Sequence, residues 1–125
     1  MMRTLRASLE SIEPGRVVVR VPFDVALTQQ DGFFHAGITS TIADTAGGYA
    51  GYSVFAPDAA VLTVEFKINL LRPAIGEYLE AVGQVIKAGR TLTITQAEVF
   101  AHDGKRTLVA LCQQTLIQVL PGQKG

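Results

Sequence analysis

Apolar and polar residues alternate along much of the second half of this chain. Over 62–70 every second residue is apolar, and Thr, Glu, Lys and Asn stand between them. An alternation of period two predicts a long strand with one buried face. Further apolar runs predict strands over 79–85, 91–100 and 107–119, and the Asp-Gly pair at 103–104 is typical of a hairpin between the last two.

The first part of the chain is predicted to form a hairpin. Residues 17–21 are a β-branched run typical of a strand, and Pro14 and Gly15 stand just before it as a turn signal. Residues 5–12 suit a short helix and a first strand equally well, and we predict the strand.

The stretch 27–52 differs in character from these strands. Its polar first part leads past two Phe and a His into a helix that we predict from about residue 37 to 52–55, before Pro57. A glycine in a helix interior costs about 1 kcal/mol relative to alanine, yet this helix has glycines at 47, 48 and 51. We therefore expect a buried helix, with a sheet or a partner helix pressing on bare backbone.

Asp44 lies in the middle of the predicted helix. None of its neighbours three or four residues away is basic, so no ion pair within the helix accounts for it. One interpretation is an ordinary solvated carboxylate, because Asp is rarely buried unless it is paired. The small, apolar surroundings and the nearby His35 favour the alternative, a functional acid.

The order of elements predicts the fold class. Two strands, a helix and four strands in a meander indicate one helix packed on one antiparallel sheet, an α+β architecture. At 125 residues, 48% of them apolar, the chain suits a single globular domain. We place that domain at 1–120 and predict a disordered tail at 121–125.

Composition argues against several classes of function. Eleven basic residues balance eleven acidic ones, so charge predicts no nucleic-acid or membrane-surface partner. We find neither an apolar run of roughly 18 residues nor a signal peptide, and we expect a cytoplasmic protein without a membrane span. The single Cys112 lies in an apolar run and predicts a buried thiol, not a nucleophile, and no metal site or cofactor is predicted.

The spacing of residues around the helix start resembles a known family. Gln29 stands six residues before His35, and Asp44 nine residues after it, while TVEFKINLLRPA and KAGRT follow at 63–74 and 87–91. This pattern is similar to that of the hotdog-fold acyl-CoA thioesterases of the phenylacetate-degradation (PaaI-like) type. The resemblance covers nearly the whole chain, and it implies a long helix wrapped by a curved antiparallel sheet.

The resemblance also implies the reaction, the hydrolysis of an acyl-CoA thioester to a free acid and CoA. Free N–H groups at a helix start suit the oxyanion that forms on the carbonyl. The family's donor is the amide after the His, which here is Ala36 where the family usually has Gly, and Gly37 follows it at the same junction. Asp44 would act as general base or as nucleophile, two routes that the sequence leaves open.

Supporting roles follow from the same resemblance. Gln29 would donate to the thioester oxygen, although the neighbouring Gln30 is equally suitable on chemistry alone. His35 would hold the loop and the helix start, and Thr63 would place the water unless it is simply a β-former in a strand. We expect His102, in a predicted hairpin turn, to be exposed.

Amide and basic side chains near turns suit the phosphates and adenosine of CoA. The candidates are Asn69, Arg72, Lys87, Arg90 and Thr91, of which Arg72 and Arg90 are preferred.

The predicted site cannot be completed by one chain. Ala36 and Asp44 are eight residues apart, which is about 10 to 12 Å along one helix. We therefore predict a homodimer with antiparallel helices and shared sites. The family resemblance implies the same shared site, and we expect the dimers to pair into a homotetramer. Rival interpretations are a hotdog dehydratase or hydratase and a non-catalytic acyl-CoA-binding protein, and the acyl group, aryl or medium-chain, stays open.

Overall fold

The structure is a computed structural model that describes residues 1–121. Of the predicted tail at 121–125, residues 122–125 lie outside the described part. The elements in chain order are α1 (Met2–Leu5), β1 (Ser8–Glu13), β2 (Arg16–Pro22), the 3-10 turn η1 (Val25–Leu27), α2 (Ala36–Tyr52), β3 (Ala60–Leu70), β4 (Tyr78–Ala88), β5 (Leu92–His102) and β6 (Arg106–Val119).

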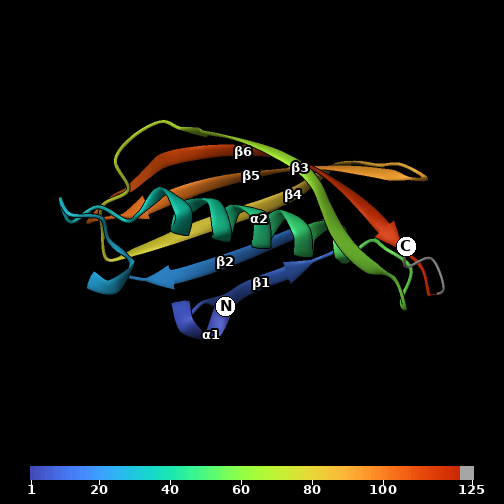
Figure 1. Ribbon diagram of the computed structural model, residues 1–125, viewed down its shortest axis with the longest axis horizontal. Helices are drawn as coiled ribbons and strands as arrows, with labels where there is room; N and C mark the ends of the chain where they lie inside the picture. The colour runs from blue at the N-terminus through green and yellow to red at the C-terminus, as the bar shows by residue number, and fades with distance from the viewer. Residues whose placement is uncertain (122–125) are drawn as a thin grey trace.

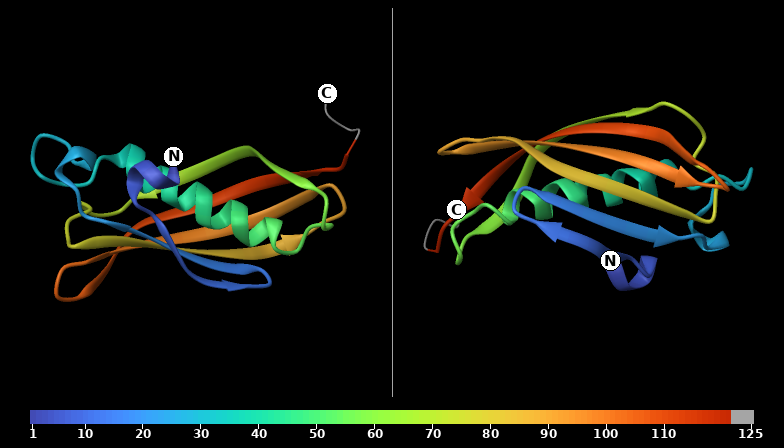
Figure 2. Two further views of the ribbon diagram at one scale, coloured as in Figure 1. Left: turned by 90° about the horizontal axis from the view of Figure 1, so that it is seen from below. Right: turned by 180° about the vertical axis from the view of Figure 1, so that it is seen from behind.

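The six strands form one curved antiparallel sheet, and α2 lies along one of its faces (Figures 1 and 2). The α+β prediction and the hotdog architecture are therefore confirmed. No helix within residues 1–121 has both the length and the apolar character needed to cross a membrane.

The predicted meander of four strands is wrong in one respect. The strand order is β1-β2-β4-β5-β6-β3, so only β4, β5 and β6 form a meander, and β3 lies at the far edge beside β6. The link from β3 to β4 crosses the ends of β5 and β6. Its backbone is held there by hydrogen bonds from Leu71 N to Val109 O (2.8 Å) and from Glu77 N to His102 O (2.7 Å).

The first residues form a short helix and then a strand, so each of the two predicted alternatives applies to part of the segment. The predicted strand 5–12 begins only at Ser8, because the short helix α1 precedes it and buries Leu5 at its end. The predicted hairpin is confirmed, since β1 pairs antiparallel with β2.

Close approach of the sheet accounts for two of the three helix glycines. A Cβ at Gly47 would overlap the side chain of Gln114, and one at Gly51 would overlap that of Leu116. On the sheet side of the same contact, a Cβ at Gly83 on β4 would overlap the backbone of α2. Gly48 faces open space in the single chain. Of the two expected alternatives, a sheet or a partner helix, glycines 47 and 51 therefore contact the sheet of their own chain.

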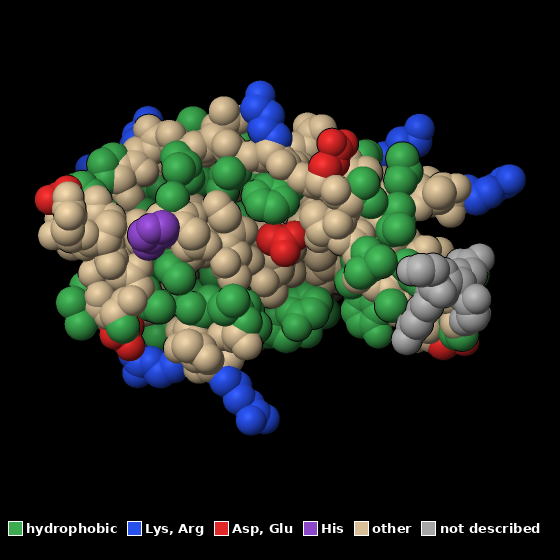
Figure 3. Space-filling view, in the orientation of Figure 1, with side chains coloured by type: hydrophobic (Ala, Val, Ile, Leu, Met, Phe, Trp, Pro, Cys, Tyr) green, Lys and Arg blue, Asp and Glu red, His purple; other side chains and the backbone are tan. Residues whose placement is uncertain are grey.

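The prediction of a half-buried strand at 62–70 is also wrong for the isolated chain. Phe66 is 46% exposed and Leu70 55%, because β3 is an edge strand with a neighbour on one side only. A register shift against β6 between Thr63 and Glu65 moves Leu62 to the opposite face from Phe66. In the view of Figure 3, hydrophobic side chains gather on the face that carries α2 and β3.

Replacement of Gly83 by alanine tests the close packing of helix and sheet. The new methyl group would overlap the Ala46 carbonyl and the Gly47 nitrogen, and overpacking of this kind typically costs 1–3 kcal/mol. We expect Gly83→Ala to lower the free energy of unfolding in urea by about 2 kcal/mol. Gln84→Ala, at the next and exposed position, serves as the control, with a change of about 0.5 kcal/mol or less. Equal stability of the two variants would contradict the packing described here.

Candidate active site

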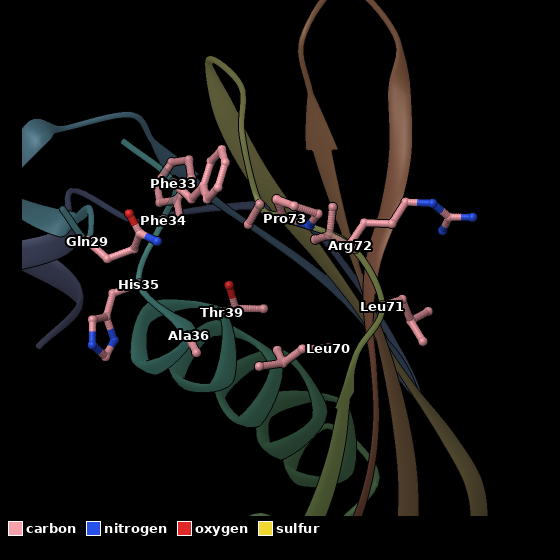
Figure 4. A pocket seen from close by; sticks show the side chains of 12 residues that line it. Gln29, Phe33, Phe34, His35, Ala36, Thr39, Leu70, Leu71, Arg72 and Pro73 are labelled. Carbon is pink, nitrogen blue, oxygen red and sulfur yellow. The ribbon is translucent and has the colours of Figure 1, made fainter. Parts of the chain in front are cut away.

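A cavity of about 520 Å³ opens at the N-terminus of α2. The loop before the helix forms one wall and the end of β3 with the residues after it forms the other (Figure 4). The residues around it are mainly apolar, with a few polar side chains, as is usual for small-molecule sites. They are Gln29, Phe33, Phe34, His35, Ala36, Thr39, Leu70, Leu71, Arg72, Pro73, Ala74 and Val109.

His35 caps the start of α2. Its Nδ1 accepts a hydrogen bond from Gly37 N–H at 2.9 Å, and its own N–H donates to Leu27 O at 2.9 Å. The side chain thus ties the loop to the helix start, as predicted for a structural role. One expectation is corrected, because the Gly37 N–H is occupied by this cap and is not free for a substrate.

Ala36 supplies the free donor at this junction. Within the described part of the chain its N–H has no acceptor, which is normal for the first residues of a helix. The positive end of the helix dipole lies at the same point. Because Ala36 also lines the cavity, its N–H can donate a hydrogen bond to a negatively charged oxygen there.

Gln29, and not Gln30, lies at the cavity. The side-chain oxygen of Gln29 accepts a hydrogen bond from the Asp31 N–H, which leaves the amide nitrogen available. That nitrogen points into the cavity (Figure 4). Gln30 is exposed and is not among the lining residues. The structure therefore distinguishes two residues that chemistry alone left equivalent.

Thr39 was missed by the sequence analysis. It is 2% exposed and lies one helical turn after Ala36, and its hydroxyl points into the cavity (Figure 4). Residues 1–121 offer this hydroxyl no hydrogen-bond partner. A position three residues after the helix start shares a face with it, so the helical period alone could have indicated Thr39.

Asp44 lies in the middle of α2 and is half-buried. The hydroxyl of Thr63 on β3 donates to its Oδ1 at 2.8 Å, so the structure brings together the two residues proposed to act on water. The side-chain amide of Gln114 on β6 also donates to Oδ1, and the Gln114 oxygen accepts from the Thr95 hydroxyl at 2.6 Å.

Gln114 was not among the residues predicted from the sequence. A signal was present, because three glutamines interrupt the apolar strand 107–119, and one of them, Gln114, shares a strand face with Cys112 and Leu116. A polar side chain on the buried face of a strand requires hydrogen-bond partners.

One chain does not bring the carboxylate to the cavity. Asp44 is not among the lining residues, and it follows Ala36 by eight residues of α2, which corresponds to about 12 Å. Each chain therefore carries an unpaired N–H donor at the helix start and a hydrogen-bonded carboxylate farther along the same helix.

The predicted CoA-binding residues are scattered. Arg72 lines the cavity, and its Nη1 donates to Leu108 O at 2.9 Å. Asn69 lies in a separate hollow with Glu65 and Lys67. Arg90 and Thr91 lie in the β4–β5 hairpin, at the end of the sheet away from the start of α2 (Figure 1). Of these residues, only Arg72 lines the cavity within one chain, and its guanidinium points away from α2 (Figure 4).

Cys112 is a buried thiol, as predicted. Burial, reinforced by the charge of Asp44, raises its pKa to about 11. The thiol is therefore protonated at neutral pH and is a poor nucleophile.

The expectation that His102 is exposed is wrong. It is the last residue of β5, its Nδ1 lies 3.0 Å from the Tyr78 hydroxyl, and its buried Nε2 lies 3.7 Å from Glu80. The carboxylate of Glu80 also contacts Arg20 at 2.8 Å and Arg106 at 3.5 Å. Three strands besides β5 supply these partners, so their proximity depends on the sheet and cannot be read from the local sequence.

Burial alone would raise the pKa of Glu80. The hydrogen bond from Arg20 and the charges of Arg20, His102 and Arg106 outweigh burial, and the pKa lies below its usual value. The cluster contributes none of the residues that line the cavity. We therefore assign it to stability.

The comparisons with known proteins agree with this geometry. A sequence model of the Thioesterase superfamily matches residues 31–108. The crystal structure of a thioesterase family protein from Silicibacter pomeroyi is 48% identical, with a TM-score of 0.94 over 95% of this chain and 88% of that one. A Saccharolobus solfataricus protein named as an esterase is 32% identical over 106 residues, 84% of this chain and 74% of its own.

Human acyl-coenzyme A thioesterase 13 is a more distant relative. It is 27% identical over 95 residues, which cover 75% of this chain and 67% of its own length. The resemblance to hotdog thioesterases that was stated from the motif spacing is thereby confirmed.

The Glu80 cluster predicts a specific loss of stability in acid. A carboxyl whose pKa is lowered on folding contributes stability above its unfolded pKa, and this contribution is lost as the pH falls through the folded value. We expect the wild-type free energy of unfolding to fall more steeply below about pH 4.5 than that of Glu80→Gln. Urea titrations between pH 3 and 7 measure this, with Glu98→Gln on the same sheet as control. Parallel curves for wild type and Glu80→Gln would contradict the assignment.

Proposed function

The chain belongs to the thioesterase superfamily and is a thioester hydrolase, and we propose that it hydrolyses acyl-CoA at sites shared by two copies of the chain. The observation that carries this proposal is the separation within α2. Ala36 and Asp44 are eight residues apart, and a short carboxylate cannot span the resulting distance of about 12 Å.

A second copy related by a two-fold axis resolves the separation. If the two α2 helices run antiparallel, the Asp44 of each copy lies near the Ala36 of the other. Each dimer then contains two complete sites. Pairing of such dimers into a homotetramer stays a prediction from the family resemblance.

The surface proposed for the second copy is the edge formed by β3 and the adjacent face of α2. β3 is an eleven-residue edge strand, and long exposed edges with apolar side chains are prone to pair with another chain. Val64 is 56% exposed and Phe66 46%, while Tyr52 at the end of α2 is 44% exposed. Gly48 offers open space on the same helix.

In the proposed reaction the thioester carbonyl oxygen accepts hydrogen bonds from Ala36 N–H and the Gln29 amide. These donors stabilise the negative charge that develops on that oxygen. Asp44 of the other copy removes a proton from a water placed by Thr63, or attacks the carbonyl itself. In the first route the water oxygen bonds to the carbonyl carbon, the carbon–sulfur bond breaks, and the proton taken by Asp44 passes to the leaving CoA thiolate. In the second route the carbon–sulfur bond breaks as an anhydride forms between the acyl group and Asp44, and a water then hydrolyses this anhydride to the free acid and supplies the proton of the CoA thiol.

The CoA phosphates are assigned to Arg72 at the cavity and to Arg90 and Thr91 of the second copy. The two-fold axis carries the β4–β5 hairpin of that copy toward the cavity end of the first. Asn69 lies in the hollow with Glu65 and Lys67, apart from the cavity, and we do not place it at this site.

Two observations favour hydrolysis over the dehydratase interpretation. The Nδ1 of His35 is occupied by the helix cap, and its ring points away from the centre of the cavity (Figure 4). A dehydratase needs a His that faces its substrate and exchanges protons with it. Thiol release separates the hydrolase from both the dehydratase and the non-catalytic binder.

We expect Asp44→Asn to lower turnover by 100-fold or more, since general base catalysis is typically worth 10² to 10⁴. The amide keeps the shape of the side chain, so the melting temperature should stay close to wild type. Thiol release is measured on acyl-CoAs of increasing chain length, with phenylacetyl and hydroxybenzoyl thioesters included. Asp58→Asn, an exposed aspartate beyond the end of α2, is the control. Activity above about a tenth of wild type in Asp44→Asn would remove Asp44 from the mechanism.

A further inference from the structure

Gln114 occupies an unusual position for an amide. It lies on β6 beneath the middle of α2 and is only 2% exposed. Its side-chain oxygen accepts a hydrogen bond from the Thr95 hydroxyl at 2.6 Å. Its nitrogen donates to Oδ1 of Asp44 and lies 3.3 Å from the Asp44 backbone oxygen. One buried side chain therefore contacts both the carboxylate and the backbone of the same residue.

The chemistry of the partners fixes the orientation of this amide. Carboxylate and carbonyl oxygens only accept, so the NH2 group must face Asp44. The oxygen then faces Thr95, whose hydroxyl donates to it. A flipped amide would place its oxygen against two acceptor oxygens of Asp44 and is excluded.

The two oxygens of Asp44 are left in different situations. Oδ1 accepts from both Thr63 and Gln114. For Oδ2, residues 1–121 provide no hydrogen-bond partner. Two donors on one oxygen restrict rotation of the carboxylate and leave the other oxygen available for chemistry.

An independent observation shows that the helix accommodates this amide. A Cβ at Gly47 would overlap the Gln114 oxygen and would lie 2.8 Å from the Thr95 hydroxyl oxygen. Glycine is unfavourable in a helix interior, but at position 47 it leaves the space that the Gln114 amide occupies. Thr95 is itself completely buried.

We propose that Gln114, oriented by Thr95, is a positioning residue for catalysis, which holds Oδ1 of Asp44 so that Oδ2 faces the thioester or its attacking water. This inference rests on the proposed role of Asp44. The contribution is one of orientation, and small misplacements of a reacting group can cost up to 100-fold in rate.

The test compares Gln114→Met with Gln113→Met. Methionine keeps the length of the side chain but has no N–H donor. Gln113 is the adjacent residue, exposed on the opposite face of the strand. We expect kcat to fall about 10- to 100-fold in Gln114→Met with KM within about threefold, and Gln113→Met to match wild type. Melting temperatures are recorded for each variant, and assays are run well below them.

Thr95→Val is a second variant. Gln114 keeps its N–H donor, but its side-chain oxygen loses the hydrogen bond from Thr95 that orients the amide. We expect kcat to fall about 3- to 10-fold, and the double variant with Gln114→Met to be no slower than Gln114→Met alone, because Thr95 acts through the amide. Thr93→Val, at a similarly buried threonine of β5, is the control. Effects that multiply in the double variant, or a folded Gln114→Met with kcat within twofold of wild type, would overturn the proposal.

A spectroscopic measurement does not depend on turnover. In protein labelled with ¹⁵N-glutamine, the side-chain NH2 signals of Gln114 are assigned by their loss in Gln114→Met, or by elimination with the other glutamine variants if that variant does not fold. We expect these signals to shift in Asp44→Asn and in Thr95→Val, and those of Gln113 to stay in place. Unmoved Gln114 signals would overturn the proposed contact. An absence of thiol release from every acyl-CoA by wild type would instead refute the proposed function.

Discussion

The close packing of α2 on the sheet decides where the polar groups of the site lie. Gly83 lets the helix backbone approach β4, and Gly47 leaves the space into which the Gln114 side chain extends. At this separation the Gln114 side chain reaches the Asp44 carboxylate from the sheet beneath the helix, and Thr63 reaches it from β3. A bulkier helix would be lifted from the sheet, and Asp44 would lose its support.

The geometry of a single helix then imposes the second constraint. The free N–H at Ala36 is available only at the helix start, whereas Asp44 is held where the sheet can reach it, about two turns farther along. The two groups to which we assign the reaction are therefore held apart by the same rigid helix. Apolar residues on the edge strand β3 are exposed in the single chain, and this is the surface that we propose a second copy covers to complete the site.

The features that could be predicted are those set by residues that are close together in the sequence. The spacing of Gln29, His35 and Asp44 indicated the helix start and its carboxylate, because all three lie in one loop and one helix. Features set by strand pairing were missed. Gln114 meets Asp44 from 70 residues away, His102 is buried by partners on other strands, and the register shift near Thr63 breaks an alternation that reads as uninterrupted.

The shared site is tested most directly by mixing two inactive proteins. Gln29→Ala removes a donor at the cavity and Asp44→Ala removes the carboxylate, so a mixed dimer has one site with both defects and one intact site. Random mixing makes about half of the dimers mixed, and about a quarter of wild-type activity should return after co-refolding. Activity that stays at the level of the single variants, although mass spectrometry confirms mixed dimers, would contradict a site built from two copies.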